Sequence, residues 1–271
     1  MITGATGLIG GAAHAVAAGD GPMLMRLSRS GAQSSMAHDL SDTASLPPLL
    51  DALAPDRIIH LAAISKPDRV EREQDSARRV NVAATATIAE WCRTRGRTLL
   101  FTSTDQVFDG TKGAPYLEDD APAPTTAYGR MKLQAEAAVL AAGGGVARLG
   151  WVLNDQPGGR PDFFHIALER LARGEHVTAV DDERRTTITA SAAARALLSL
   201  AGDGFAGLIH LAGERDTTPF QLIANAARAR GLDTARLQPI SRRTLSPPGR
   251  PGDVRLRSAL DQVRRPAMAI A

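Results

Sequence analysis

Three side chains of this sequence have the types and spacing that reduction of a carbonyl group requires. Thr104 follows a short apolar run, and Tyr128 precedes Lys132 by four residues. On a helix, residues four apart share one face, and an ammonium group near a phenol favours the phenolate and lowers its pKa. A hydroxyl, a phenol and an amine in this order predict proton delivery to a ketone oxygen as a nicotinamide cofactor delivers hydride to the carbon.

Each of these groups has an expected role. Thr104 would hydrogen-bond the ketone oxygen and polarise it, because it follows the apolar segment 97–102 and open α/β sheets hold ligands at such strand ends. Tyr128 would deliver the proton, and Lys132 would tune it. Asn81 is a candidate fourth catalytic residue that relays protons behind the lysine, with an ordinary structural role as the alternative.

A glycine loop near the start of the sequence predicts a dinucleotide-binding site. Gly4, Gly7 and Gly10 are spaced three residues apart at an expected strand-to-helix junction. The first suits a tight turn, the second lets the backbone approach a pyrophosphate, and the third lets the helix pack on the sheet. The helix N-terminus adds free N–H groups for the phosphates. The expected cofactor contacts here are Gly4, Thr6, Gly7, Leu8, Ile9 and Gly10.

The residues after the second expected strand indicate which dinucleotide binds. Sites that prefer NAD have an acidic residue here for the ribose 2′-hydroxyl, whereas this chain has Ser28, Arg29 and Ser30. A guanidinium binds a 2′-phosphate in a bidentate manner, so Arg29 favours NADPH, with NADH as the alternative cofactor. A solvated loop arginine is the other interpretation. Further cofactor contacts are expected from Asp39, Leu40, Leu61, Ala62, Ala63, Tyr128 and Lys132.

The elements that must hold these groups alternate between strands and helices. Strands are expected at 22–27, 57–63, 97–102 and 145–149, and helices at 8–18, 43–53, 68–95 and 125–142. This alternation predicts an α/β fold, a Rossmann-type doubly wound parallel sheet covered on both faces. The first strand is short, because only three residues precede the glycine loop. Either the true start of this strand lies upstream, or the strand provides few residues to hold the glycine loop in place.

A smaller C-terminal substrate-binding lobe is expected after Trp151, where the alternation breaks. Asn154 to Arg160 has the composition of a crossover loop. Helices are expected at 161–173, 189–201 and 217–230, and a strand at 207–211 is expected to return to the main sheet. The predicted division is an NADP-binding Rossmann domain at 1–150 and a mainly substrate-binding lobe at 151–271.

Composition narrows the function classes. The 271 residues have a formal net charge of +3, and no basic block with interleaved aromatic residues predicts nucleic-acid binding. No apolar run approaches the roughly 20 residues that span a bilayer, and the N-terminus has no signal-peptide pattern. The single cysteine, Cys92, suits a reducing cytoplasm, which is the expected location. The six histidines lack metal-binding spacing, so no metal is expected.

Several of these motifs together resemble a known family. The glycine loop with Y-x-x-x-K is similar to the extended short-chain dehydrogenase/reductases. The segments S-T-D-Q-V-F-D-G (103–110) and P-Y-L-E-D (115–119) resemble the dTDP-4-dehydrorhamnose reductase branch. The resemblance continues through 60–63, 81–82, 148–152, 210–213 and 250–256. It implies a domain that holds NADPH and a smaller lobe that closes over a nucleotide-linked 4-keto sugar.

The expected substrate contacts follow from this resemblance and from the preference of a diphosphate for guanidinium groups. Trp151 could stack on the ligand or be a buried structural indole. The expected substrate-binding residues are Lys66, Thr104, Asp105, Gln106, Trp151, Arg184, Arg185 and Arg250.

Two departures from the family pattern bear on the substrate. Gln106 stands where the reductase branch has tyrosine, and where related sugar-nucleotide dehydratases have a glutamate that takes part in eliminating water. An amide cannot act as that base, so dehydration is disfavoured, whereas reduction needs only Thr104, Tyr128 and Lys132. The second departure is D-D-E-R-R-T (181–186), where the family has D-Q-x-G-x-P-T.

Three hypotheses follow. The first is an NADPH-dependent reductase of a nucleotide-linked keto sugar that takes its proton from Tyr128. The second is a sugar-nucleotide epimerase with tightly held NAD. The third is a non-catalytic regulatory subunit similar to the β-subunit of methionine adenosyltransferase. Besides the sugar substrate, a second copy of the chain is a candidate partner, and neither nucleic acid nor membrane is expected.

Overall fold

The computed structural model describes residues 1–18, 24–156, 161–213, 215–246 and 248–259. Residues 22 and 23 of the expected second strand and residues 157–160 of the expected crossover loop lie outside the described residues.

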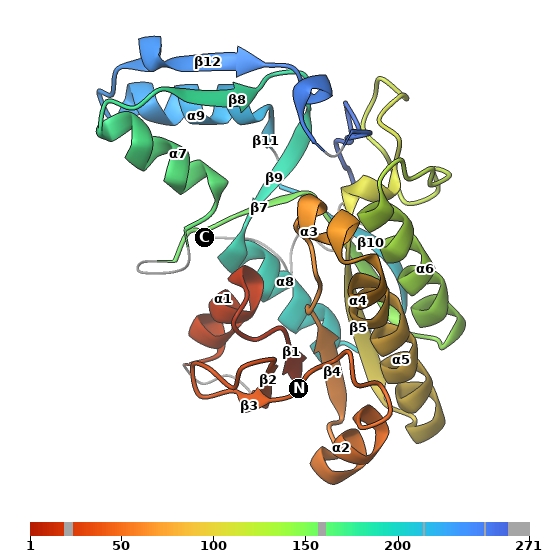
Figure 1. Cartoon of the computed structure of the whole chain (residues 1–271). Helices are drawn as coiled ribbons and strands as arrows, with labels where there is room; N and C mark the ends of the chain where they lie inside the picture. The colour runs from red at the N-terminus through yellow and green to blue at the C-terminus, as the bar shows by residue number, and fades with distance from the viewer. Residues whose placement is uncertain (19–23, 157–160, 214, 247, 260–271) are drawn as a thin grey trace.

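Seven parallel strands form the central sheet, in the order β10-β6-β5-β4-β1-β2-β3 (Figure 1). The order runs outward from β1 in both directions, which is the doubly wound arrangement. The prediction of an α/β, Rossmann-type parallel sheet is confirmed. The strands are β1 Ile2–Thr3, β2 Arg26–Ser28, β3 Met36–Ala37, β4 Arg57–His60, β5 Thr98–Thr104, β6 Gly145–Leu149 and β10 Gly207–Leu211.

The short first strand lies in the middle of this sheet. Ile2 pairs with Arg26 of β2 on one side and with Ile59 of β4 on the other. Both residues of β1 are buried. The glycine loop that follows is therefore supported by neighbouring strands on both sides.

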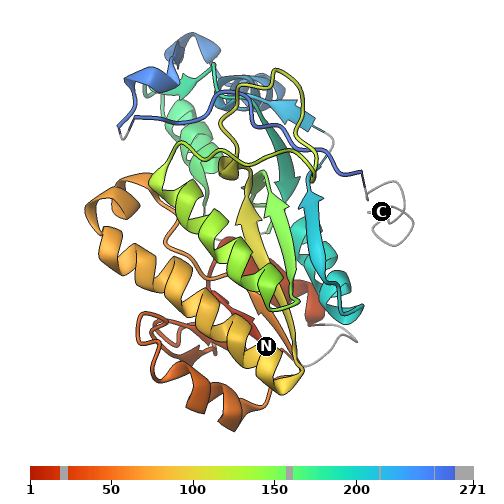
Figure 2. The same ribbon diagram turned by 90° about the vertical axis from the view of Figure 1, so that its right-hand side faces the viewer.

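Helices cover both faces of the sheet. One face packs against α1 (Leu8–Ala17) and α8 (Ala190–Gly202), with a core rich in alanine and leucine. The other face packs against α2 (Leu46–Leu53), α5 (Ala84–Arg95) and α6 (Ala127–Ala141). Figure 2 shows α5 and α6 side by side across the sheet. Burial on both faces explains why the segment 99–101 of β5 is continuously apolar.

The long helix expected at 68–95 is interrupted. It is divided into α3 (Pro67–Arg72), α4 (Gln74–Arg78), a π-helical turn η1 (Arg79–Ala83) and α5. Glu73 has φ −122° and ψ 45°, which is not a helical conformation. Asn81, one of the expected site residues, lies in the π-helical turn. Such turns occur frequently at functional sites.

The remaining elements form a smaller lobe with its own apolar core. That core lies between α7 (Phe163–Ala172), α9 (Pro219–Ala229) and the strand pair β8 (Val177–Val180) and β12 (Leu237–Ile240). A three-stranded sheet of β11 (Arg215–Thr217), β9 (Arg185–Thr189) and β7 (Trp151–Leu153) connects this lobe to the main body (Figure 1). In the sequence, β10 lies between β9 and β11, but it pairs with β6 in the main sheet. Across the described ranges, no helix is long and apolar enough to cross a membrane.

Candidate active site

The end of β5 and the start of α6 bring the three chemical groups into one region. Thr104 is the last residue of β5, and the 3-10 turn η2 (Asp105–Val107) follows it. A Cβ on Gly129 would lie 2.2 Å from the carbonyl oxygen of Gln106. Only glycine therefore allows α6 to approach η2 this closely, and Tyr128 is held beside the end of β5.

Lys132 is fixed in the interior, one turn further along α6. Its Nζ donates a hydrogen bond of 2.5 Å to the carbonyl oxygen of Thr102 and lies 3.9 Å from the centroid of the Phe101 ring. Burial lowers the pKa of Lys132 to about 7, although the charge of Glu136 acts in the opposite direction. The amine is therefore close to its titration midpoint at neutral pH.

Tyr128 differs from the expectation that a nearby ammonium lowers its pKa. Burial raises the pKa of the phenol, the negative charge of Asp105 raises it further, and only Arg185 acts to lower it. Lys132 is instead engaged with a backbone carbonyl and an aromatic ring. A phenol of ordinary pKa already keeps its proton at neutral pH, so the raised pKa leaves Tyr128 protonated but makes it a weaker acid.

Asn81 is buried and its side chain is fully engaged with the backbone of Ile64. Its Oδ1 accepts from Ile64 N at 2.8 Å, and its Nδ2 donates to Ile64 O at 3.0 Å. The carbonyl of Asn81 accepts from Thr85 Oγ1 at 3.0 Å. These contacts anchor the segment after β4, and a proton relay through Asn81 stays a prediction.

A hydrogen-bonded histidine, which the sequence reasoning did not assign to the site, connects this region to the glycine loop. His60 Nδ1 lies 2.6 Å from Thr3 Oγ1, and its Nε2 lies 3.0 Å from Thr85 Oγ1. Burial lowers the pKa of His60 to about 3, with the charge of Lys132 adding to the effect, so the ring is neutral. The signal in the sequence was the histidine at the end of an apolar strand.

The glycine loop has the shape that a pyrophosphate requires. Gly4 has φ +68°, and a Cβ there would lie 2.8 Å from Ala62 N. A Cβ on Gly10 would lie 2.5 Å from Gly4 O, so α1 packs directly on the loop. Gly7 caps α1 without a side chain, and the first turn contains no acidic residue. The N–H groups at this end are therefore available to an anion, and the site fits a dinucleotide.

The residues after β2 lie at the same edge of the sheet as the glycine loop, because β1 and β2 are parallel neighbours. Ser28 is buried, with its Oγ 2.7 Å from Ser35 Oγ, whereas Arg29 and Ser30 are exposed. Hydrogen bonds from Ser41 lower the pKa of Asp39, and the charge of Arg29 adds to this effect. Arg29 therefore lies close to Asp39, an expected cofactor contact, with its guanidinium accessible.

A charge cluster lies on the substrate side, in which Asp105, Glu183 and Arg185 are buried and Arg250 is half-buried. Arg185 Nη2 lies 3.3 Å from Asp105 Oδ1, and Arg185 Nε lies 3.2 Å from Glu183 Oε1. Arg250 Nε lies 3.6 Å from Glu183 Oε2. The Arg185 guanidinium also lies 5.1 Å from the Trp151 ring centroid. Glu183 was not among the expected site residues, although the unusual 181–186 segment pointed to this place.

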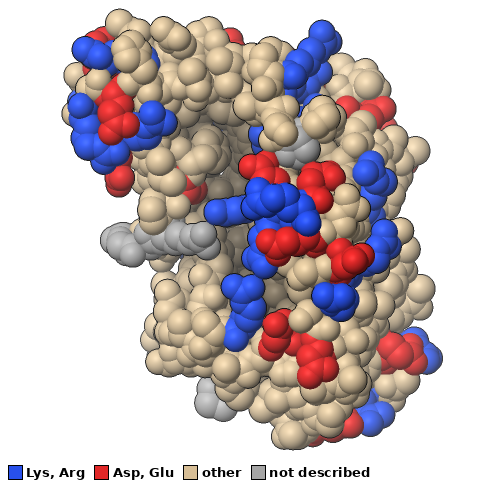
Figure 3. All heavy atoms as spheres, in the orientation of Figure 1, with Lys and Arg blue, Asp and Glu red and all other residues tan. Residues whose placement is uncertain are grey.

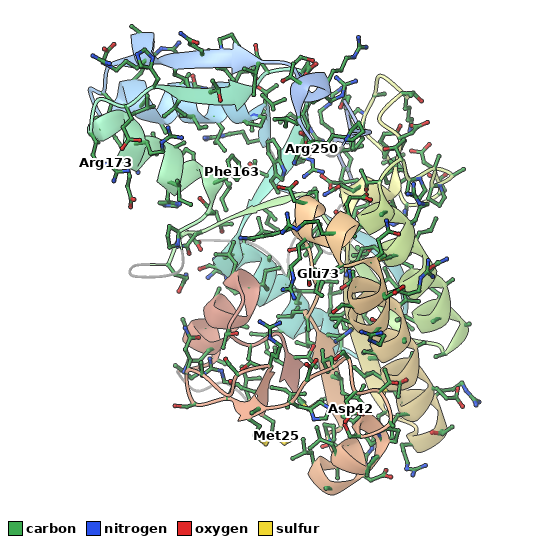
Figure 4. All side chains as sticks on the ribbon, viewed as in Figure 1. Met25, Asp42, Glu73, Phe163, Arg173 and Arg250 are labelled. Carbon is green, nitrogen blue, oxygen red and sulfur yellow. The ribbon has the colours of Figure 1, made fainter. Side chains whose placement is uncertain are left out.

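The other expected substrate residues lie around this cluster with different exposure. Arg184 and Lys66 are exposed, Gln106 and Trp151 are half-buried, and Arg250 lies where the C-terminal segment passes above α3 (Figure 4). The space-filling view shows a hollow between the smaller lobe and the main body, with charged side chains gathered on its rim (Figure 3). The structure thus brings Thr104, Tyr128 and Lys132 together with Asp105, Arg185 and Trp151 and leaves Arg184 and Lys66 at the surface.

The doubly wound sheet, the glycine loop and the Tyr128–Lys132 pair define an extended short-chain dehydrogenase/reductase. Within this class, the RmlD substrate binding domain model matches residues 1–264. The chain belongs to this family.

Individual relatives agree with this assignment. The chain is 32% identical to a dTDP-4-dehydrorhamnose reductase of Streptomyces griseus, over 97% of this chain and 86% of that protein. It is 29% identical to the methionine adenosyltransferase 2 subunit beta of Xenopus tropicalis, over 94% of this chain and 79% of that protein. The fold matches the crystal structure of dTDP-4-dehydrorhamnose reductase from Bacillus anthracis in complex with NADP, with a TM-score of 0.87, 20% identity and coverage of 97% and 91% of the two chains.

Proposed function

We propose that this protein is an NADPH-dependent reductase of a nucleotide-linked keto sugar. The observation that carries the proposal is the convergence of Thr104, Tyr128 and Lys132 where the start of α6 lies against the end of β5, in a molecule whose β1, from the same sheet, leads into the glycine loop. The Streptomyces griseus relative, named as a dTDP-4-dehydrorhamnose reductase, supports this class of substrate.

The cofactor site is formed by residues at one edge of the sheet. Gly4, Gly7 and Gly10 would admit the pyrophosphate, and Arg29 would bind the 2′-phosphate that distinguishes NADPH from NADH. When bound, the cofactor supplies hydride to the ketone carbon. The Bacillus anthracis structural neighbour, which holds NADP, supports the choice of NADPH.

The residues of the chain supply the proton and the polarisation. As hydride reaches the ketone carbon, negative charge builds on the oxygen, and the protonated Tyr128 transfers its proton there. Tyr128 is protonated at neutral pH, as a proton donor must be, although its raised pKa makes the phenol a weaker acid than an ordinary tyrosine. Thr104 would donate a hydrogen bond to the same oxygen. Lys132 holds the start of α6 against β5 through Thr102.

The smaller lobe would hold the nucleotide part of the substrate. Arg184 is exposed and Arg250 partly so, which leaves their guanidinium groups accessible to a diphosphate. Arg185 is already paired with two buried carboxylates. We assign residues 1–150 to the cofactor and residues 151–271 mainly to the substrate, and we propose a cytoplasmic location.

The experiment is a screen of nucleotide-linked keto sugars, with simple ketones as controls, followed by NADPH absorbance. Oxidation of NADPH with a dTDP-4-keto-6-deoxy sugar, and little with simple ketones, is the expected result. Equal rates with simple ketones would remove the link to sugar nucleotides. Sugar interconversion without net NADPH consumption, together with copurified NAD, would indicate an epimerase instead.

The similarity to methionine adenosyltransferase 2 subunit beta supports a second candidate, a regulatory subunit. In that role the cofactor site would stabilise a partner-binding surface. Recovery of a stoichiometric synthetase in a pull-down, together with no turnover in the screen, would favour it over the reductase.

A further inference from the structure

A chain of buried polar contacts connects the hydroxyl of Thr104 to Arg185. Thr104 Oγ1 donates to Asp105 Oδ1 at 3.1 Å, and the same carboxyl oxygen lies 3.3 Å from Arg185 Nη2. We propose that Arg185 is a positioning residue: by holding the carboxyl group of Asp105, it controls whether the Thr104 hydroxyl can donate to the substrate ketone. This inference rests on the proposed reductase function.

The Thr104 hydroxyl can donate only one hydrogen bond, because a hydroxyl has one hydrogen. Thr104 Oγ1 accepts from the backbone N–H of Gln106 at 3.3 Å and directs its own hydrogen at Asp105. An ionised carboxylate only accepts hydrogen bonds, so it keeps that hydrogen. Thr104 is free to polarise a ketone oxygen only when Asp105 carries a proton and becomes the donor.

The surroundings of Asp105 bring it close to that protonated state. Its side chain is 1% exposed, and its Oδ2 has no hydrogen-bond partner among the described residues. A bare carboxylate oxygen away from water costs more free energy than a neutral carbonyl oxygen in the same place. Burial raises the pKa of Asp105 to about 6, whereas Arg185 and the Thr104 hydrogen bond act to lower it.

Three ionisable groups interact with this carboxyl group, and a fourth, Arg250, pairs with one of them. Arg185 of β9 is in direct contact, and Glu183 lies just before that strand. Arg250 pairs with the second oxygen of Glu183, and Tyr128 of α6 senses the charge of Asp105. The nearby charge of Glu183 raises the pKa of Asp105, in opposition to Arg185. Arg185 and Glu183 therefore act on Asp105 with opposite sign.

The test is the pH profile of kcat for NADPH oxidation with the keto-sugar substrate. The wild type should lose activity as pH rises through the titration of Asp105. Asp105→Asn should lose this descending limb, because its amide can donate to Thr104 at every pH. Arg185→Gln should move the limb to higher pH by about 1 to 3 pH units, since an opposite charge has been removed. Arg185→Lys should restore it towards the wild-type position.

Glu183→Gln provides the matched variant of opposite sign. Removal of its negative charge should move the limb to lower pH, and circular dichroism establishes whether each variant is folded. A limb that persists in Asp105→Asn would overturn the proposal. An unmoved limb in both Arg185→Gln and Glu183→Gln, with kcat changed by the same factor at every pH, would also overturn it and leave the cluster a structural role.

If the proposed function is wrong, the protein will oxidise NADPH with no keto sugar at any pH, which distinguishes this outcome from a wrong role for Arg185. The carboxyl group can then be followed without turnover by infrared difference spectroscopy of the wild type against Asp105→Asn. The band of the protonated acid should titrate, and its midpoint should rise in Arg185→Gln and fall in Glu183→Gln. Midpoints that do not move would overturn the role of Arg185 independently of any substrate.

Discussion

The ammonium group of Lys132 lies 3.9 Å from the centroid of the Phe101 ring. The ring belongs to β5 and the amine to α6, so this contact fixes the helix that carries Tyr128 against the strand that ends at Thr104. Replacing water by an aromatic face and one carbonyl leaves the ammonium poorly solvated. The pKa of Lys132 is therefore lowered, which makes the stability of the folded protein depend on pH.

The buried Lys132 should make the protein less stable at neutral pH than at alkaline pH. Its pKa is about 7 in the folded protein and near 10.5 in the unfolded chain. Between these values the unfolded chain binds more protons, so the free energy of unfolding should rise with pH in this window. Lys132→Met should abolish this rise, as measured by urea unfolding at pH 7 and pH 9. Lys66→Met, at an exposed position, is the control and should keep the wild-type rise. An equal pH dependence of the free energy of unfolding in wild type and Lys132→Met would contradict the lowered pKa of Lys132.

Two adjacent glycines of α1 should respond in opposite ways to alanine. A Cβ on Gly10 would lie 2.5 Å from Gly4 O and 2.7 Å from Ala5 Cα, whereas a Cβ on Gly11 meets nothing within 4 Å. Gly10→Ala should cost about 1–3 kcal/mol of stability and weaken NADPH binding. Gly11→Ala should be neutral or stabilise by about 0.5–1 kcal/mol, because alanine favours the helix. Thermal unfolding and NADPH titration measure both, and similar effects of the two changes would argue against close packing of the loop.

Arg29 should distinguish the two nicotinamide cofactors. Its side chain is exposed near Asp39, an expected cofactor contact. Arg29→Ala should weaken NADPH binding by about 10- to 100-fold, the range of a charge-assisted hydrogen bond, and should leave NADH binding nearly unchanged. Fluorescence titration with both cofactors tests this. An equal loss for both would show that Arg29 does not recognise the 2′-phosphate.

The central strands were predictable because they are buried on both faces and form apolar runs between glycine and helix signals, whereas the exposed edge strand β3 has no such run. The break in the expected helix at 68–95 was not predictable, because it depends on contacts distant in the sequence. Asn81 binds both backbone groups of Ile64 from within the π-helical turn. No periodicity in the local sequence encodes that pairing.

The arrangement of the charge cluster was also not predictable from the sequence. Arg185 begins β9 and Arg184 directly precedes it in an extended bridge with Asp253, so their side chains point to opposite sides. The sequence marked both as candidate diphosphate partners and could not indicate which one faces the interior. In the structure Arg185 lies against Asp105 and Trp151, and Arg184 is exposed. The departure at 181–186 was visible, but its meaning required the fold.

The role of Tyr128 as proton donor in a sugar-nucleotide reductase is tested by NADPH oxidation with a dTDP-4-keto-6-deoxy sugar in wild type and Tyr128→Phe, with NADPH affinity measured for both. We expect steady turnover by the wild type, a loss of at least about 100-fold in kcat for the variant, and unchanged NADPH binding, because only the phenolic proton is removed. NADPH consumption by Tyr128→Phe at the wild-type rate would contradict it.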